Sequence, residues 1–161
     1  MKLVTAAILA ALATAGCAGI GGNFQEPDVR LDHVVVRGVG LTGGVLDLIV
    51  GVHNPNNFDL RGTSLRLGFD VEDAHVGDVD YRSDFAVQRG DTTMLTLPVQ
   101  FEWAGVGAAV RTALAYGDLP YRMKGELTLQ TPFGRASVPF SREGRAPLTR
   151  TGARIPIPGS H

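Results

Sequence analysis

Residues 121–130 of the chain read YRMKGELTLQ, and residues 131–140 read TPFGRASVPF. In the first stretch, apolar or small side chains alternate with polar ones, and in the second, apolar side chains return at Ala136, Val138 and Phe140. A period of two places successive side chains on opposite faces of an extended strand. Because turn-forming residues lie between the two stretches, the sequence predicts a β-hairpin with one face in a dry core.

The same period runs through most of residues 29–140. Three further rows of apolar side chains are predicted to face inward: Leu46, Leu48, Val50 and Val52; Leu65, Leu67, Phe69 and Val71; Leu95, Leu97, Val99 and Phe101. Short strands are also predicted at residues 74–79 and around Phe85 and Val87. Pro98 removes one ladder donor, so its strand is expected at an edge or a bulge.

One segment, residues 103–116, breaks this period. It is rich in alanine and carries four apolar side chains at helical spacing: Val106, Val110, Ala113 and Leu114. Gly117 follows as a C-cap, so we expect one helix here. A single amphipathic helix in a β domain covers an open end or face of the sheet.

About seven short strands at even spacing, with one helix inserted late, favour two packed antiparallel sheets. The predicted fold class is therefore all-β, as an immunoglobulin/fibronectin-like antiparallel β-sandwich of about seven strands with one inserted helix. This domain is expected to span residues 28–145. Residues 146–161, with Arg150, Arg154, Pro156 and Pro158, are expected to form a disordered or loosely docked tail.

The first segment, residues 1–17, has the pattern of an export signal. After a lysine at position 2 comes an apolar run that is too short to span a bilayer, and small residues then precede Cys17. Ala15, Gly16 and Cys17 resemble the lipobox of bacterial lipoproteins, although Thr14 stands where that signal usually has Leu. The resemblance implies a lipoprotein signal peptide that ends at a lipidated Cys17.

In such a lipoprotein, the cysteine sulfur carries a diacylglyceryl thioether and the new amino group is acylated, for example with palmitate. Two or three acyl chains anchor a protein in effect permanently, whereas one does so only marginally. Ala18, in place of the Asp that signals inner-membrane retention, favours the outer membrane facing the periplasm. An ordinary secretory signal with an incidental cysteine, or a signal anchor, is the alternative. Residues 18–27 are glycine-rich and are interpreted as a flexible tether.

The residue pattern argues against catalysis. The histidines stand singly at His33, His53, His75 and His161, and the chain lacks Gly-x-Ser-x-Gly, His-Glu-x-x-His and a glycine-rich phosphate loop. We therefore expect that the chain is not an enzyme and that it has no catalytic or metal site, no cofactor and no small-molecule substrate. A net charge of -1, from 15 basic and 16 acidic residues, provides no positive field to bind nucleic acid.

One polar cluster leaves an alternative open. It comprises Asp70, Glu72, Asp73, Asp78, Asp80 and Asp84. Hard cations such as calcium bind carboxylate oxygens, so a hairpin that gathered these side chains would form a site. The spacing does not match an EF-hand, and acidic turns are normally solvated. We interpret the cluster as surface residues, with calcium binding as the alternative.

Residues 50–60, VGVHNPNNFDL, form an apolar strand that ends in Asn-Pro-Asn and an aromatic residue. This string resembles the group 2 late embryogenesis abundant proteins, whose domain is also called the water stress and hypersensitive response domain. Further features in the order of that family are Pro27, Val29, Leu31, the Leu-x-Leu-Pro-Val stretch at 95–99, Tyr121, Gly125 and Gly144. The resemblance covers residues 27–144 and implies a sandwich of antiparallel strands with one helix.

Asn54, Pro55 and Asn56 are predicted to form a corner that ends a strand. Pro55 fixes its own φ and pushes Asn54 towards extended geometry, while both Asn amides bond neighbouring backbone. Turn chemistry accounts for these residue types, so we prefer a structural turn motif to a ligand-binding role.

Two functions are compatible with this sequence. The resemblance implies a non-enzymatic envelope lipoprotein with a desiccation- or water-stress-related domain, which protects or binds envelope components under stress. The alternative is a periplasm-facing adaptor lipoprotein, whose edge strand or sheet face binds a specific envelope protein complex. In both, the lipid joins the domain to the membrane and an envelope protein is the candidate partner.

Overall fold

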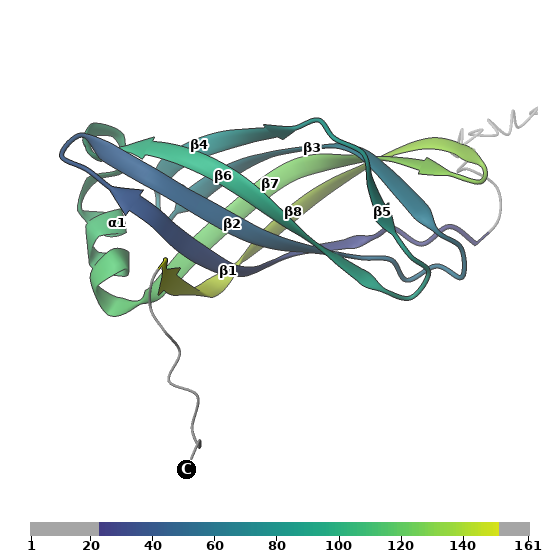
Figure 1. Cartoon of the computed structure of the whole chain (residues 1–161), viewed down its shortest axis with the longest axis horizontal. Coiled ribbons are helices and arrows are strands. Elements are labelled where there is room, and N and C mark those ends of the chain that lie inside the picture. Colours follow the sequence, from purple (N-terminus) through teal and green to yellow (C-terminus); the bar gives the residue numbers. More distant parts are fainter. Residues whose placement is uncertain (1–22, 152–161) are drawn as a thin grey trace, which may run out of the picture.

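The computed structural model describes residues 23–151. Within this range the chain forms eight strands and one helix (Figure 1). In chain order they are β1 (Asp28–Val39), β2 (Gly43–His53), β3 (Leu60–Val71), β4 (Ala74–Tyr81), β5 (Phe85–Val87), β6 (Thr92–Glu102), α1 (Trp103–Tyr116), β7 (Asp118–Thr131) and β8 (Gly134–Arg150). The predicted signal peptide with Cys17, and the first part of the predicted tether, lie outside the described residues.

The eight described strands belong to one sheet. Hydrogen-bonded neighbours follow the order β4-β3-β7-β8-β1-β2-β6, and β5 pairs with β3. Every pairing is antiparallel except that of β1 with β8, in which Val34–Val36 lies parallel to Leu148–Arg150. The sheet curls until its edge strands β4 and β6 lie near each other, so it nearly closes on itself (Figure 1).

The all-β class and the single helix expected from the sequence are confirmed, but an immunoglobulin-like sandwich of two separate sheets is not. The reason is β8, which pairs with β7 as far as Pro147 and with β1 from Leu148 onwards. Residues 146–150 therefore belong to the sheet, and the prediction of a tail from residue 146 is wrong for them. Ala146 is buried, and the N–H of Leu148 donates to the carbonyl of Gly117 at 2.9 Å. Residues 152–161, the rest of that predicted tail, lie outside the described residues.

The apolar rows predicted from the period of two line a continuous core. In β2, β3 and β6, every side chain expected to face inward is between 0% and 6% exposed. Helix α1 covers one end of this core, where Val106, Val110 and Ala113 are buried against it; the side chain of Leu114 lies outside the description. Gly117 ends the helix in the left-handed conformation, with φ 73°, and its N–H donates to the carbonyl of Ala113 at 3.0 Å.

Gly125 in β7 occupies a point of close approach between strands. A Cβ atom at this position would lie 2.1 Å from the carbonyl oxygen of Arg66 and 2.8 Å from both Leu67 Cβ and the Phe140 ring. Because that carbonyl belongs to the paired strand β3, it cannot withdraw without disturbing the ladder. We expect Gly125→Ala to lower the free energy of unfolding by about 1–3 kcal/mol, as measured by urea denaturation.

The control for this variant is Gly38→Ala in β1, where nothing lies within 4 Å of the added atom. Its free energy of unfolding is expected to change by less than about 0.5 kcal/mol. Equal losses in the two variants would show that the close approach at Gly125 is not what excludes a side chain.

Candidate functional site

The segment that carries the family resemblance lies at the end of β2. Asn54 follows the last residue of that strand and is 0% exposed, and Asn56 is 5% exposed. Pro55 between them faces solvent, where its lack of an N–H leaves no donor unpaired. We call Asn54, Pro55 and Asn56 the asparagine corner.

The Asn54 side chain connects two turns. Its Nδ2 donates to the carbonyl oxygens of Phe58 at 2.8 Å and Val87 at 3.1 Å. Its Oδ1 accepts from the backbone N–H of Asn56 at 3.0 Å and from Asn56 Nδ2 at 2.9 Å. The backbone of Asn54 also bonds the β5–β6 turn, through Asp91 O at 2.9 Å and Gly90 N at 3.0 Å. One buried amide thus holds the β2–β3 turn against the turn between β5 and β6.

The Asn56 side chain holds the segment that leads into β1. Its Oδ1 accepts from the backbone N–H of Gln25 at 2.7 Å, and its Nδ2 donates to the carbonyl of Gln25 at 2.8 Å. The four amide hydrogens of Asn54 and Asn56 are therefore all donated within the chain. Hydrogen bonds of this kind are those of a structural turn. That the corner has a structural role and not a ligand-binding one stays a prediction.

Asn54→Ala removes both donors and the shared acceptor from a buried position. It leaves the carbonyls of Phe58 and Val87 and the N–H of Asn56 without their partners. Each buried group that loses its partner costs about 1–3 kcal/mol, so we expect the free energy of unfolding to fall by about 3 kcal/mol.

Asn57→Ala is the matched control, because Asn57 lies in the same turn but is exposed; we expect a change of less than about 0.5 kcal/mol. Denaturant unfolding measures both variants. If Asn56→Ala kept full stability but abolished binding to a partner, the corner would be a recognition site instead of a structural one.

The predicted acidic cluster does not gather at one point. Asp70 and Asp78 flank His75, whereas Asp80 pairs with Arg82 and Asp84 pairs with Arg61. Among residues 23–151, no group of three or more His, Cys, Asp or Glu side chains has the arrangement of a metal site. In the described structure, these carboxylates therefore share no point at which they could bind one calcium ion.

His75 on β4 is the titratable group that these carboxylates affect. Its Nδ1 lies 2.7 Å from Asp70 Oδ1 and its Nε2 lies 3.2 Å from Asp78 Oδ2. The hydrogen bond to Asp70, and next that to Asp78, raises the pKa of His75 above its ordinary value of 6.5. The side chain is more than half exposed, so its contribution to stability is that of a surface pair, roughly 0.2–1 kcal/mol.

Proton NMR titration of the protein should therefore give His75 a pKa above that of a free histidine, and Asp70→Asn should lower it. Because the pKa is raised in the folded state, this stabilisation is complete below the unfolded pKa and is lost as pH rises through the folded pKa. Asp73→Asn is a suitable control, since Asp73 is not one of the carboxylates that raise the pKa of His75. A His75 pKa that is equal in the wild type and in Asp70→Asn would contradict the assigned pairing.

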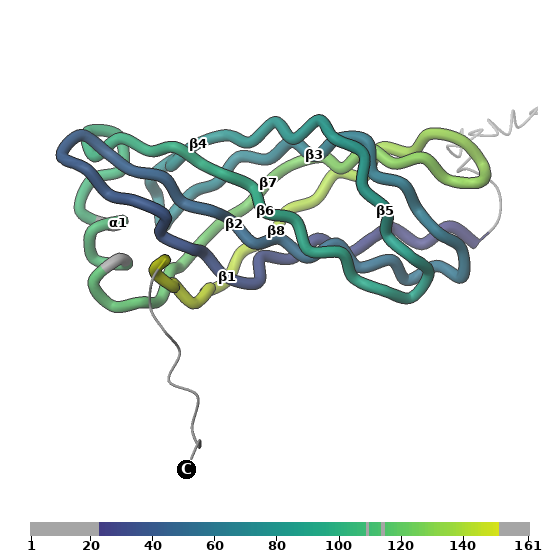
Figure 2. Tube along the Cα trace, viewed as in Figure 1, coloured from purple at the N-terminus to yellow at the C-terminus, as the bar shows by residue number. Residues whose placement is uncertain are grey.

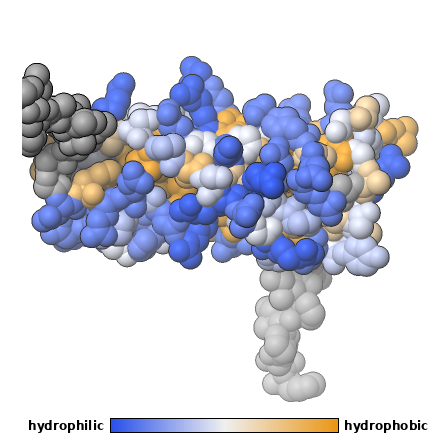
Figure 3. All heavy atoms as spheres, turned by 180° about the vertical axis from the view of Figure 1, so that it is seen from behind, coloured by the Kyte–Doolittle hydropathy of each residue, from blue (hydrophilic) through white to orange (hydrophobic). Residues whose placement is uncertain are grey.

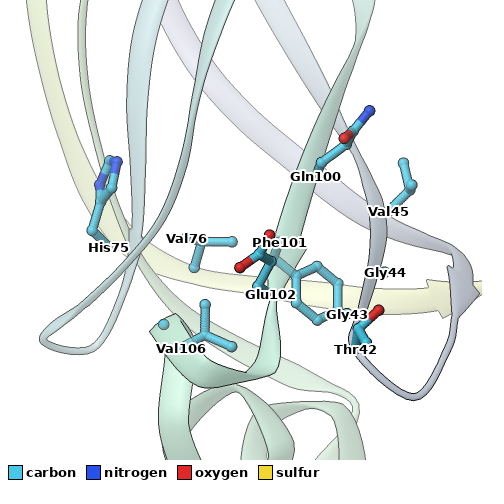
Figure 4. Close-up of a pocket in the computed structure, with 11 residues that line it drawn as sticks. Thr42, Gly43, Gly44, Val45, His75, Val76, Gln100, Phe101, Glu102 and Val106 are labelled. Atoms are coloured by element: carbon cyan, nitrogen blue, oxygen red, sulfur yellow. The ribbon is translucent and has the colours of Figure 1, made fainter.

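A hollow of about 560 Å³ lies where the edge strands β4 and β6 separate above α1 (Figure 4). The ring of Phe101 and the side chains of Val76 and Val106 form its apolar part, and Glu102 and Gln100 its polar part. His75 stands at the rim and is already engaged with Asp70 and Asp78. One carboxylate and one committed imidazole do not make a paired acid and base, so the lining offers no catalytic arrangement.

No helix within residues 23–151 has the length and hydropathy required to cross a membrane.

Two structural contributions were not predicted from the sequence. Gln25 reaches Asn56 across 31 positions through its backbone, so its side-chain type carried no signal. Asp47 on β2 is 6% exposed, and its Oδ2 accepts from Arg37 Nη2 at 2.6 Å. Asp47 alternates with the apolar row of Leu46 and Leu48, so the period of two predicted a polar outward side chain and gave no signal for its burial or its partner.

Comparison with known proteins places these features in a family. A family model described as late embryogenesis abundant protein matches residues 50–144. The solution structure of a protein from Arabidopsis thaliana has a TM-score of 0.62 and 20% identity, over 79% of this chain and 85% of that one. At that identity the likeness shows the fold alone.

Two other solved structures are similar at lower scores. A protein provisionally assigned as late embryogenesis abundant has a TM-score of 0.43 and 20% identity, over 76% of this chain and 71% of that one. A protein from Archaeoglobus fulgidus has a TM-score of 0.45 and 13% identity, over 78% of this chain and 97% of that one. No curated protein matches the sequence.

Proposed function

The chain belongs to the late embryogenesis abundant protein family, and on that premise we propose that it is a non-enzymatic lipoprotein of the bacterial envelope. Its water-stress-related domain protects or binds envelope components as water is lost. The observation that carries the proposal is the family match over residues 50–144, which includes the asparagine corner. The family is generally non-enzymatic, and the described hollow adds no catalytic pair.

The domain acts as a folded body in this proposal. Its core is continuous from β1 to β8, so the chain has enough buried apolar surface to fold in dilute buffer. Disordered proteins that gain helix on drying lack such a core. Protection therefore comes from the surface of a stable β domain and not from a transition between coil and helix.

The surface of this domain carries many ion pairs between arginine and carboxylate groups. They are Arg30–Asp28, Arg61–Asp84, Arg66–Glu126, Arg82–Asp80, Arg122–Glu143, Arg142–Asp28 and Arg145–Asp118. In dilute solution, exposed pairs of this kind add little stability, because water screens them. At 4 Å the attraction is about 1 kcal/mol in bulk water and about 4 kcal/mol at an effective dielectric of 20. Loss of water therefore strengthens these pairs, which supports a domain that keeps its fold on drying.

The proposed membrane attachment depends on Cys17. Two or three acyl chains on this residue hold the domain at the envelope, and Ala18 favours the outer membrane facing the periplasm. The sequence contains one Cys, which cannot form a disulfide within the chain. Acylation gives this unpaired cysteine of an exported chain a function.

The lipid anchor predicts a defined mature protein. Intact mass measurement of the protein extracted from membranes should show a chain that starts at Cys17 and carries the mass of its acyl groups. Labelled palmitate should be incorporated into the wild-type protein and not into the Cys17→Ser variant. A mature chain that starts elsewhere, or an unmodified Cys17, would contradict the anchor.

The same two proteins test the function. A deletion strain should survive drying and osmotic shock less well than its parent, and wild-type protein should restore survival more fully than Cys17→Ser. Unchanged survival of the deletion strain would count against the protective role, whatever the mass of the protein.

An adaptor function is the second candidate, and the one-sided hydrogen-bond pairing of the two edge strands favours it. Among the described strands, β4 pairs only with β3 and β6 only with β2, and the hollow lies between them. Such edges accept an extended segment of a partner by strand addition. Crosslinking in intact membranes separates the candidates, because an adaptor yields one stoichiometric partner and general protection yields many weak contacts.

A further inference from the structure

An apolar ring projects from the β7–β8 turn. Phe133 is 54% exposed at the tip of the segment 131–134. The turn holds it there, because Thr131 Oγ1 donates to the carbonyl of Gly134 at 2.8 Å and accepts from the N–H of Phe133 at 3.1 Å. Phe133 is therefore presented by a hydrogen-bonded turn and not by a loose loop.

This ring lies at the end of the domain that holds the asparagine corner. Its centroid is 5.6 Å from that of Phe58, with the planes at 86°, and Phe58 packs against the core. The carbonyl of Phe58 accepts from Asn54, and Asn56 holds Gln25, so the turn at 131–134 and the start of the described chain share one end (Figure 2). Helix α1 and the β1–β2 loop lie at the other end (Figure 1).

The length of chain before the domain limits how far this end is from a lipid on Cys17. Asn23 is six residues after Cys17, and an extended chain of that length reaches about 20 Å. By contrast, β7 is 14 residues long and runs for about 45 Å between the two ends of the domain. A lipid on Cys17 therefore holds the end with the asparagine corner within about 20 Å of the bilayer, whereas α1 lies about 45 Å further along the domain.

Charge does not supply the contact at this end. Residues 23–26 and the turns at 54–59, 88–91 and 131–135 carry three acidic and two basic side chains, so the two signs nearly balance: Glu26, Asp59, Asp91, Arg89 and Arg135. Figure 3 shows hydrophilic residues over much of the face seen from behind, with hydrophobic residues between them and towards both ends. An aromatic ring beside a near-neutral surface suits the interface of a bilayer, where amphipathic or aromatic side chains gather at the headgroup level.

We propose that the turn at 131–134 seats Phe133 in the interface of the bilayer that holds the lipid of Cys17. The domain then stands with the asparagine corner towards the membrane and α1 towards the aqueous side. This inference rests on the proposed lipid anchor and adds the surface that meets the membrane. Leu41 is 100% exposed, but its loop is bonded to Trp103 of α1 through Gly40 and Thr42, so it lies far from the bilayer in this orientation.

Tryptophan quenching by brominated lipids tests the orientation. The chain has one tryptophan, Trp103, whose Nε1 donates to the carbonyl of Gly40 at the α1 end, so the wild type supplies a baseline far from the lipid. The full acylated protein is inserted in vesicles of phosphatidylethanolamine and phosphatidylglycerol, with and without bromine on the acyl chains. Phe133→Trp adds an indole at the proposed contact, and Leu41→Trp adds one at the opposite end.

The indole of Phe133→Trp is expected to lose about half of its added emission in brominated vesicles and to shift to shorter wavelength. The emission of the wild type and of Leu41→Trp should stay unchanged. Urea unfolding of each variant checks its fold. Should Phe133→Trp unfold, Pro132→Trp at the exposed neighbouring position repeats the measurement.

The outcomes separate this inference from the function on which it rests. If the wild type does not float with the vesicles, the anchor fails, and the orientation is overturned with it. If the wild type floats but Phe133→Trp is not quenched, or Leu41→Trp is quenched equally, the anchor stands and the orientation is wrong. If the indole of Phe133→Trp is not quenched by lipid but is shielded from water by a protein in native membranes, the orientation is wrong and the turn binds that protein instead.

Discussion

The buried side-chain amide of Asn54 holds together the turns at one end of the domain. It joins the end of β2 to the carbonyl of Val87 and shares its oxygen with Asn56, which in turn holds Gln25. Three segments far apart in the sequence therefore meet in one hydrogen-bonded unit. Because the chain enters β1 through this unit, the corner also determines from which end of the domain the N-terminal segment leaves.

The parts of the fold that were predicted from the sequence are those with a local cause. The period of two identified the strands and their inward rows, and the spacing of Val106, Val110 and Ala113 identified the helix. Pro98 was placed correctly on an edge strand, because its missing N–H is a local property. The single sheet was missed because it depends on the parallel pairing of Val34–Val36 with Leu148–Arg150, which follows Pro147 and has no signal in either segment alone. Likewise, the turn-forming residues of the corner were identified, but not their partners at Gln25 and Val87.

Surface chemistry and membrane attachment act together in the proposed function. The ion pairs that surround the sheet contribute little in water and more as the dielectric falls, whereas the apolar core loses part of its driving force when water is withdrawn. A domain with both retains attractive interactions across a range of hydration. In the proposed orientation, a lipid holds one end of the domain, and helix α1 faces the space beyond the membrane.

Amide hydrogen exchange tests whether the asparagine corner is a rigid part of the fold. The N–H of Gln25 and that of Asn56 both donate to buried side-chain oxygens of the corner. We expect both to exchange as slowly as the N–H of core residues such as Leu127, through unfolding of the whole domain. Exchange of Gln25 and Asn56 at the rate of an open loop, while Leu127 stays protected, would contradict it.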